Sequence, residues 1–155
     1  MYITGESGTG KEVAARLIHE ASSRKRGPFM AISCAALPDT LLEPELFGHE
    51  KGAFTGATRR AQGKVEMALK GTLFLDEIGN LSLALQSKLL TVLQHRKIQR
   101  VGSNREIPVN FRLICATNMP LHELVYEKKF RQDLLYRINT VEIRVPSLRE
   151  RPDDI

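Results

Sequence analysis

The chain has 155 residues, of which 42% are hydrophobic and 26% are charged. This is the size and composition of one ordinary globular domain, and it excludes a disordered chain. Lysine and arginine exceed aspartate and glutamate by 23 − 18 = 5, a moderate positive charge that favours anionic partners such as nucleotides or nucleic acids without choosing between them. No apolar run reaches the roughly 18 residues of a membrane helix, and the N-terminus lacks the layout of a signal peptide. We therefore expect a cytoplasmic protein without a membrane segment.

Both ends of the sequence resemble cut ends. Four residues precede the first glycine-rich turn, fewer than the about five to six of a typical strand, so the first strand is predicted to be clipped. Pro146 to Pro152 is predicted to be an extended linker, and Asp153 and Asp154 resemble the cap of a helix whose body is missing. We expect an excised part of a longer chain, although Met1 could equally be a genuine start.

Helical and strand-like segments alternate along the chain. The first helix is predicted over residues 11–21, with a sheet-facing side formed by Val13, Ala14, Leu17, Ile18 and Ala21. Buried strands are predicted at residues 29–33, 72–75, 112–116 and 141–145, and later helices at residues 83–96 and around Leu134, Leu135 and Ile138. Because parallel strands need long crossovers, this alternation predicts an α/β fold, a parallel sheet with helices on both faces.

Two other features stand outside this alternation. Residues 48–63 carry four glycines and Phe54, which favours a long ordered loop with an exposed aromatic side chain, and such loops are usually functional. The two cysteines, Cys34 and Cys115, have no metal-ligand spacing, and we interpret them as buried reduced thiols on strands.

A phosphate-binding motif follows the first strand. The pattern G-x-x-x-x-G-K lies between an apolar strand remnant and an amphipathic helix, and its residues are Gly5, Glu6, Ser7, Gly8, Thr9, Gly10 and Lys11. Glycines let backbone amides turn toward phosphates, while the Lys11 ammonium reaches the β- and γ-phosphates. Glu12 stands where Ser or Thr would offer a hydroxyl to Mg²⁺, so its carboxylate must turn away and the metal must depend on other ligands.

Two carboxylates end the apolar run at residues 72–75. In a parallel sheet the carboxyl ends of the strands face the ligand, so Asp76 is a candidate Mg²⁺ ligand and Glu77 a candidate for polarising the attacking water. This requires the chain to leave the strand by Glu77, because consecutive strand residues point to opposite faces. The alternative, that this pair only caps the next helix, is less favoured because the chain also carries the phosphate-binding motif.

Polar residues after two later segments are further candidates. Asn118 follows the strand at residues 112–116 and could sense the attacking water or the γ-phosphate, although Thr117 and Asn118 could merely cap a turn. Arg131 and Arg137 are six positions apart, about 120° from a common helical face. They could approach the γ-phosphate of a neighbouring subunit or form surface ion pairs with Asp133 or Glu127.

Six motifs give the chain a resemblance to a known family. They are G-E-S-G-T-G-K-E at residues 5–12, E-L-F-G-H-E-K-G-A-F-T-G-A at 45–57, G-T-L-F-L-D-E-I at 71–78, R-L-I-C-A-T-N at 112–118, F-R-Q-D-L-L-Y-R at 130–137 and P-S-L-R-E-R at 146–151. The sequence strongly resembles the central AAA+ domain of sigma-54-dependent transcriptional activators, the bacterial enhancer-binding proteins. The resemblance extends over essentially all residues, and implies that residues 1–155 are the α/β part of that domain without its helical lid.

The resemblance implies roles for individual residues. Glu12 is the family's ordinary residue at its position, which removes it as an objection to ATP binding. The loop Gly52, Ala53, Phe54, Thr55, Gly56, Ala57 is the family signature, with Phe54 and Thr55 at the tip that contacts sigma-54 when ATP is bound. Arg131 and Arg137 match trans-acting arginines, which implies a ring oligomer, usually a hexamer. Residues 98–107 match a second pore-facing loop.

One position departs from the family pattern. The strand before Cys34 commonly ends in Asn, which bonds the glutamate corresponding to Glu77, whereas this chain has Ser33. The serine side chain is shorter than that of asparagine, and we keep Ser33 as a candidate switch residue at this position.

The sequence leads to three hypotheses of function. The first is an ATP hydrolase, with ATP and Mg²⁺ as cofactors, that remodels the sigma-54 RNA polymerase holoenzyme and leaves promoter DNA targeting to a separate domain. The second is a nucleotide-dependent binding module without hydrolysis, motivated by the missing lid. The third, an AAA+ helicase or clamp loader, does not explain the loop at residues 52–57.

Overall fold

A five-stranded parallel sheet forms the centre of the molecule. The computed structural model describes residues 1–154, and the strand order is β2-β3-β6-β1-β7. The strands are β1 (Tyr2–Thr4), β2 (Phe29–Ser33), β3 (Gly71–Asp76), β6 (Phe111–Thr117) and β7 (Glu142–Arg144). Every pairing in this sheet is parallel, so the predicted α/β class and parallel sheet are confirmed.

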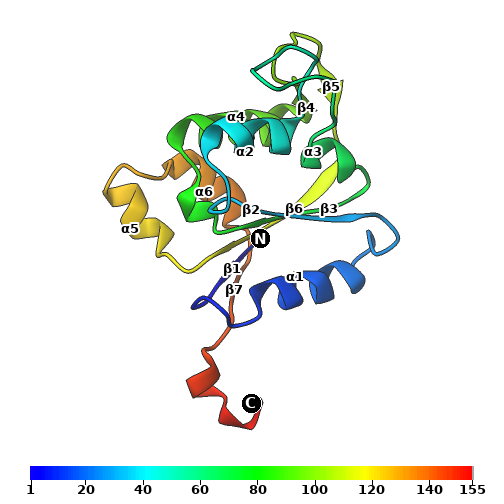
Figure 1. Cartoon of the computed structure of the whole chain (residues 1–155). Helices are drawn as coiled ribbons and strands as arrows, with labels where there is room; N and C mark the ends of the chain where they lie inside the picture. The colour runs from blue at the N-terminus through cyan, green and yellow to red at the C-terminus, as the bar shows by residue number, and fades with distance from the viewer. Residues whose placement is uncertain (155) are drawn as a thin grey trace.

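Helices cover both faces of the sheet, but unequally (Figure 1). Helix α1 (Lys11–Glu20) packs on one face, and the other face carries α2 (Asp39–Phe47), α3 (Lys64–Met67), α4 (Leu83–His95) and α6 (Gln132–Ile138). Helix α5 (Leu121–Tyr126) follows β6, and single 3₁₀ turns lie at η1 (Ile78–Asn80), η2 (Leu148–Glu150) and η3 (Pro152–Asp154). Helices α2, α3 and α5 were not predicted from the sequence.

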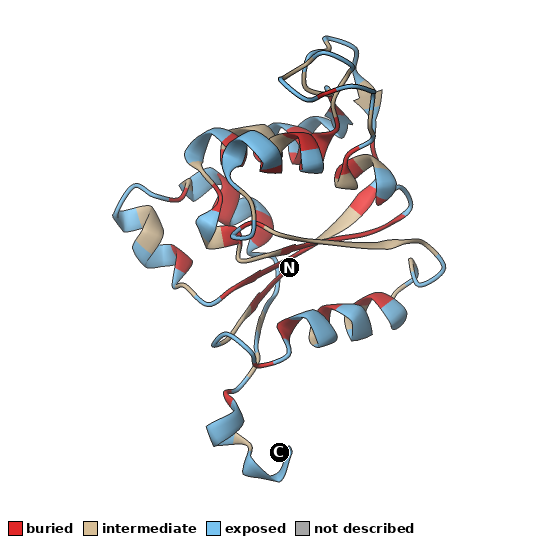
Figure 2. Ribbon diagram, in the orientation of Figure 1, coloured by how far each residue is buried: buried red, intermediate tan, exposed pale blue. Residues whose placement is uncertain are grey.

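Strand alternation divides the core into two clusters. Leu73 and Leu75 of β3 belong to the larger cluster under α2, α3, α4 and α6. Phe74 points the opposite way and joins Ile114 and Ala15 in the smaller cluster under α1. Full burial of each such side chain stabilises the fold by about 1.5–3 kcal/mol, so the central strands β3 and β6 anchor the sheet (Figure 2).

Two of the predicted buried strands are only partly buried. All five residues of β2 have intermediate exposure, and Glu142 and Arg144 of β7 are exposed. The reason is topological, because β2 and β7 are the two edge strands of the sheet. Their positions along the chain were predicted correctly, and their burial was wrong.

The buried side of α1 also differs from the prediction. Val13 and Leu17 are 62% and 60% exposed, whereas Lys11, Ala15 and His19 are buried. His19 is satisfied in the core because its ring nitrogens lie 2.8 Å from Thr72 Oγ1 and 3.1 Å from the Gly27 carbonyl oxygen. A count of apolar residues alone overlooks polar side chains that are buried with partners.

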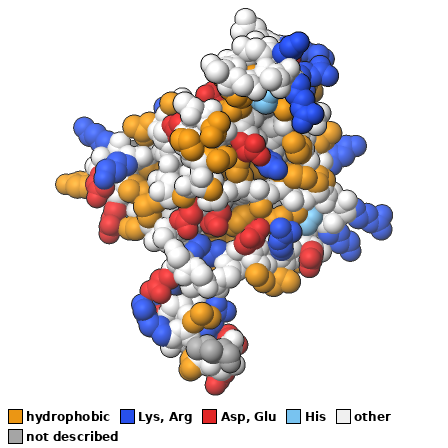
Figure 3. Space-filling model, viewed as in Figure 1, with side chains coloured by type: hydrophobic (Ala, Val, Ile, Leu, Met, Phe, Trp, Pro, Cys, Tyr) orange, Lys and Arg blue, Asp and Glu red, His pale blue; other side chains and the backbone are white. Residues whose placement is uncertain are grey.

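Residues 48–63 form the predicted ordered loop, and a hairpin supports it. Strands β4 (Lys97–Ile98) and β5 (Ile107–Pro108) pair antiparallel, and isolated bridges join His49 to Ala61 and to Val101. The second loop predicted at residues 98–107 is the connection of this hairpin. On the face drawn in Figure 3, Lys and Arg side chains gather beside the tip that these two loops form.

The C-terminal segment is not the extended linker that the sequence predicted. Ser147 caps the turn η2, and its backbone amide donates to a Glu150 carboxylate oxygen at 2.8 Å. The pattern S-x-x-E is the signature of such a capping box, and it was overlooked because two prolines flank it. Within residues 1–154, no helix has the length and apolar character needed to cross a membrane.

Candidate nucleotide site

The glycine-rich loop joins β1 to α1 at the carboxyl edge of the sheet. Gly8 and Gly10 have φ angles of 78° and 90°, and nothing lies within 4 Å of a Cβ placed on either residue. Backbone conformation rather than space therefore requires glycine at both positions. The loop exposes Glu6, Ser7 and Gly8, so its backbone is accessible for binding.

Lys11 is held at the start of α1 and turns back into this loop. Its side-chain amine donates to the carbonyl oxygens of Gly5, at 3.0 Å, and of Glu6, at 2.9 Å. The residue is 6% exposed, and an ammonium group has three donors. One positive charge is thus positioned where the loop's backbone and the N-terminus of α1 both favour an anion.

Glu12 pairs within α1 and makes no hydrogen bond to the glycine-rich loop among the described residues. Its carboxylate lies 3.3 Å from Arg16 Nη2 one helical turn further along α1, and both side chains are about half exposed. An exposed pair of this kind contributes little stability, at most about 1 kcal/mol. Its effect is to direct the carboxylate along the surface of α1.

The chain leaves β3 at Glu77, as the sequence required. Asp76 is the last strand residue, and its Oδ1 accepts the Glu77 amide hydrogen at 2.9 Å. Glu77 has φ 55° and ψ 48°, a left-handed conformation that non-glycine residues adopt at a cost of about 1–2 kcal/mol. The turn places both carboxylates at one strand end, and Glu77 Oε2 is buried without a hydrogen-bond partner among the described residues.

Cys34 lies beside these carboxylates. It follows β2, and its backbone amide donates to the Asp76 carbonyl oxygen at 2.9 Å. Burial, reinforced by the charges of Asp76 and Glu77, raises the pKa of the Cys34 thiol to about 12. Burial also raises the pKa of Cys115 on β6. Both are free, buried thiols, as predicted, although Cys34 lies just outside its strand.

Asn118 connects the end of β6 to the glycine-rich loop. Its Nδ2 donates to Ser7 Oγ at 3.0 Å, and β6 lies between β3 and β1 in the sheet. The turn-capping role belongs to Thr117, whose Oγ1 accepts the Met119 amide hydrogen at 3.0 Å. Thr117 therefore makes the turn-capping contact, and Asn118 is the residue that reaches the loop, while its role as a sensor stays a prediction.

Ser33 makes a local bond instead of a bond to Glu77. Its Oγ accepts the Ala35 amide hydrogen at 3.3 Å, and its backbone is in register with Asp76 of β3. Glu12, Ser33 and Asp76 line one cavity of about 220 Å³. Ser33 therefore lies in the candidate site, but the described structure contains no hydrogen bond from it to Glu77.

The C-terminal segment adds contacts that the sequence did not predict. Arg149 pairs with the Glu6 carboxylate, and Arg151 donates to the Thr9 carbonyl oxygen. Both acceptors belong to the glycine-rich loop, about 140 residues earlier in the chain. The basic residues of P-S-L-R-E-R are visible in the sequence, but only the fold shows that they contact the glycine-rich loop.

Phe54 packs against its own loop, contrary to the exposed position predicted. Its ring meets His49 edge to face, with centroids 5.0 Å apart, and its exposure is intermediate, whereas Thr55 is exposed. Gly52 and Gly56 have φ angles of 80° and 96°. These glycines allow the tight turn, which the bond from the Gly52 amide to the Ala57 carbonyl oxygen closes at 2.9 Å.

The two candidate arginines lie in different surroundings. Arg131 precedes α6 and pairs with both carboxylate oxygens of Asp133, at 2.9 and 2.8 Å, which is one of the ion pairs considered from the sequence. Arg137 lies in the last turn of α6 and donates to the Leu93 carbonyl oxygen at 2.9 Å. Because Arg131 lies outside the helix, the helical angle expected between the two residues does not apply.

A parallel sheet that brings Lys11, Asp76, Glu77 and Asn118 to one edge defines a P-loop NTPase of the AAA+ class. The fold agrees with a cryo-electron microscopy structure of Hsp104, with a TM-score of 0.65 at 19% identity over 95% of this chain and 28% of that chain. Residues 1–144 match the family model described as the sigma-54 interaction domain, so the chain belongs to this family.

Individual relatives agree with this assignment. The chain is 60% identical to the Nif-specific regulatory protein of Herbaspirillum seropedicae and 56% identical to the regulatory protein AtoC of Escherichia coli, in both cases over all of its length. It spans 29% and 34% of those proteins. A crystal structure of NtrX from Brucella abortus in complex with ATP has a TM-score of 0.90 at 38% identity, over 99% of this chain and 33% of that chain.

Proposed function

We propose that this chain is the ATP-hydrolysing part of a protein that activates transcription by remodelling the sigma-54 RNA polymerase holoenzyme. The observation that supports hydrolysis most directly is the bond from Asn118 to Ser7, because it joins the end of β6 to the phosphate-binding loop beside Asp76 and Glu77. Family membership and the complex of NtrX with ATP support the choice of nucleotide and partner.

ATP binding is assigned to Gly5–Glu12. The loop amides and the N-terminus of α1 bind the phosphates, and Lys11 exchanges its two carbonyl acceptors for phosphate oxygens. Arg149 and Arg151 contact Glu6 and Thr9 of the same loop. The exchange favours the phosphates, because their negative charge adds an electrostatic attraction to the Lys11 ammonium that a neutral carbonyl oxygen lacks.

Mg²⁺ fits the donors at the end of β3. Oxygen ligands suit this hard cation, which usually takes one or two carboxylates together with substrate phosphates and water. Asp76 would hold the ion, while Glu12 is directed toward Arg16. When bound, the metal neutralises charge on the phosphates.

Glu77 polarises the attacking water, and Asn118 responds to the nucleotide. The unpaired Glu77 Oε2 is a buried acceptor without a protein donor in the described structure, and a water molecule would satisfy it. Asn118 can exchange its Ser7 acceptor for a phosphate oxygen or for this water. Ser33 lies close enough in the sheet to link this site to β2, and we keep it as a possible switch residue.

The loop Gly52–Ala57 is the proposed contact with sigma-54. Phe54 rests against His49 in this structure, and glycines on both sides allow the turn to open and present the aromatic ring. The active unit is a ring in which Arg131 and Arg137 act on the nucleotide of a neighbouring subunit. We propose a hexamer in the cytoplasm, with promoter DNA bound by a separate domain.

The Phe54→Ala variant of the full-length protein tests the partner. It removes the apolar contact and leaves the nucleotide site intact, so we expect normal ATP turnover and loss of sigma-54 binding in the presence of an ATP transition-state mimic. Native gel shift or size-exclusion chromatography measures the complex, with Thr58→Ala, directly after this loop, as an exposed control. Binding by Phe54→Ala equal to that of the unmodified protein would contradict the assignment.

A further inference from the structure

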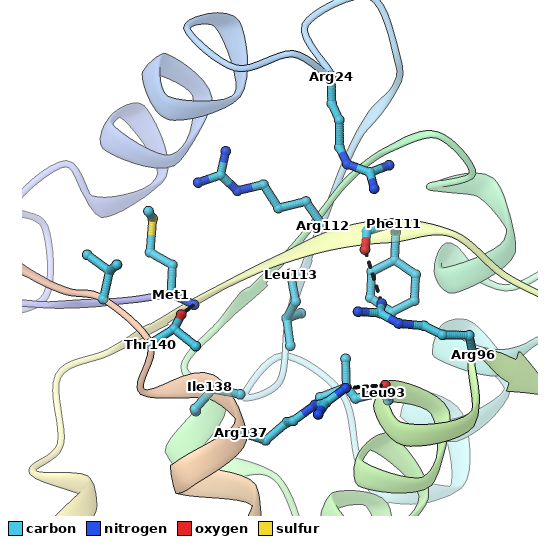
Figure 4. A pocket seen from close by; sticks show the side chains of 11 residues that line it. Met1, Arg24, Leu93, Arg96, Phe111, Arg112, Leu113, Arg137, Ile138 and Thr140 are labelled. Atoms are coloured by element: carbon cyan, nitrogen blue, oxygen red, sulfur yellow. Dashed lines mark hydrogen bonds between the residues drawn. The ribbon is translucent and has the colours of Figure 1, made fainter.

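An arginine-lined pocket lies at the opposite end of the sheet from the nucleotide site (Figure 4). It has a volume of about 370 Å³, and Arg24, Arg96, Arg112 and Arg137 line it without any aspartate or glutamate. Arg112 stands at the start of β6, whereas Asn118 follows its end. Seven strand residues span roughly 20 Å, so the chain's own glycine-rich loop is too far away to share a ligand with this pocket.

These four arginines have no carboxylate partner within salt-bridge distance among the described residues. Arg24 donates to Asn110 Oδ1 at 2.9 Å, and Arg137 donates to the Leu93 carbonyl oxygen at 2.9 Å. Both acceptors are neutral. By contrast, Arg16, Arg100, Arg131, Arg144, Arg149 and Arg151 each pair with a carboxylate. The pocket therefore concentrates uncompensated positive charge.

Arg96 is the most constrained member of this group. It ends α4 in a left-handed conformation, with φ 56° and ψ 36°, at a position where Gly or Asn is favoured. Its Nη1 donates to the Phe111 carbonyl oxygen at 3.3 Å, and its guanidinium lies 5.8 Å from the Phe111 ring centroid. The backbone turn and these contacts orient a side chain whose remaining N–H groups are free to bind a ligand.

Figure 4 shows how the group is arranged around β6. Arg96 and Arg137 lie on one side of the strand, near Leu93 and Phe111, and Arg24 and Arg112 lie on the other side. One guanidinium group binds phosphate oxygens through two parallel N–H donors. Several guanidinium groups together therefore match a chain of phosphates better than a single small anion. The volume is also within the range of small-ligand sites.

We propose that this pocket receives the phosphate chain of a nucleotide held by a neighbouring copy of the protein, and that Arg96, beside Arg137, is a further trans-acting arginine in addition to Arg131 and Arg137. The inference rests on the proposed ATP hydrolysis and extends it, because it assigns Arg96 a contact with the nucleotide. Two oriented guanidinium groups stabilise the negative charge that develops on the transferred phosphoryl group. Arg24 and Arg112 strengthen the positive field from the other side of β6.

Turnover by mixed rings tests the trans action. Arg96→Ala in the full-length protein is expected to lower kcat on the order of tenfold or more with a smaller change in KM, because the contact forms mainly in the transition state. Mixing it with Lys11→Ala, which keeps its own Arg96, is expected to restore turnover. Arg26→Ala, an exposed arginine outside the pocket, is the matched control and should keep normal kcat. An unchanged kcat in Arg96→Ala, or no restoration on mixing, would overturn the trans assignment.

A binding measurement separates failure of this inference from failure of hydrolysis. Calorimetry with inorganic tripolyphosphate is performed on Lys11→Ala and on the double variant Lys11→Ala with Arg96→Ala. We expect the second variant to bind about tenfold more weakly, whether or not the protein hydrolyses ATP. Equal affinities would overturn the anion site. Weaker binding without restoration in mixed rings would identify a free polyphosphate as the ligand, and would contradict the neighbouring nucleotide as its source.

Discussion

Glu77 shows how a single backbone angle prepares the candidate site. Its left-handed conformation separates its carboxylate from the alternating pattern of β3, and Asp76 supports the turn by accepting the Glu77 amide hydrogen. The sequence predicted the departure from the strand because two adjacent carboxylates at one site cannot follow strand geometry. It could not predict that Ser33 bonds the Ala35 amide, since serine has several backbone groups within reach.

The raised pKa of the Cys34 thiol predicts that the stability of the protein depends on pH. Because burial and two nearby carboxylates raise the pKa of Cys34 to about 12, the folded state favours the protonated thiol. The stabilisation that comes from keeping Cys34 protonated in the folded state is fully present below the ordinary thiol pKa. It is lost as the pH rises toward about 12. We expect slow alkylation of Cys34 by iodoacetamide at pH 8 in the folded protein and rapid alkylation in urea, as measured by mass spectrometry. Equal alkylation rates in the folded protein and in urea would contradict the burial of Cys34.

Among the elements, length and regularity decide what could be predicted. Strands β3 and β6 and helix α4 are long enough for their apolar pattern to stand out, and the sequence located each within one or two residues. Helix α3 and strands β4 and β5 contain four, two and two residues, too few to show a period. Helix α2 contains Pro44, which usually argues against a helix interior.

One buried ion-pair network joins three of these elements. Arg100, beyond β4, contacts Glu66 of α3 at 2.9 Å and Glu50 of the 48–63 loop at 3.1 Å. The side chains of Arg100 and Glu66 are 10% and 7% exposed, and hydrogen bonding to Glu66 is the main cause of the raised pKa of Arg100. This network holds the loop that carries Phe54 against the hairpin.

Removing the shared arginine should destabilise the protein. Arg100→Ala leaves Glu66 buried without its partner, and we expect a loss of about 3–5 kcal/mol in the free energy of unfolding, measured by urea denaturation. Lys97→Ala is the control, because its pair with Glu106 is more than half exposed on both sides and should cost less than about 1 kcal/mol. Similar losses for the two variants would show that the Arg100 network contributes no more than a surface pair.

At the scale of the whole molecule, the sheet separates two basic sites. The glycine-rich loop lies at the carboxyl ends of the parallel strands, and the arginine pocket lies at their amino ends. The composition indicated an excess of positive charge, but it could not show that four arginines without a carboxylate partner line one pocket, because the residues they contact are distant in sequence. In a ring that places the amino ends of one subunit's strands beside the carboxyl ends of its neighbour's strands, the arginine pocket and the neighbour's glycine-rich loop would contact the same nucleotide.

The most direct test is therefore the ATP turnover per subunit of the full-length protein, measured over a wide range of protein concentration with Mg²⁺ present. Our account predicts that turnover rises steeply as rings assemble, and that Glu77→Gln binds ATP but turns it over about 10²–10⁴ times more slowly at every concentration. Absence of turnover at every concentration, with ATP binding intact, would contradict the account and favour a nucleotide-dependent binding module without hydrolysis.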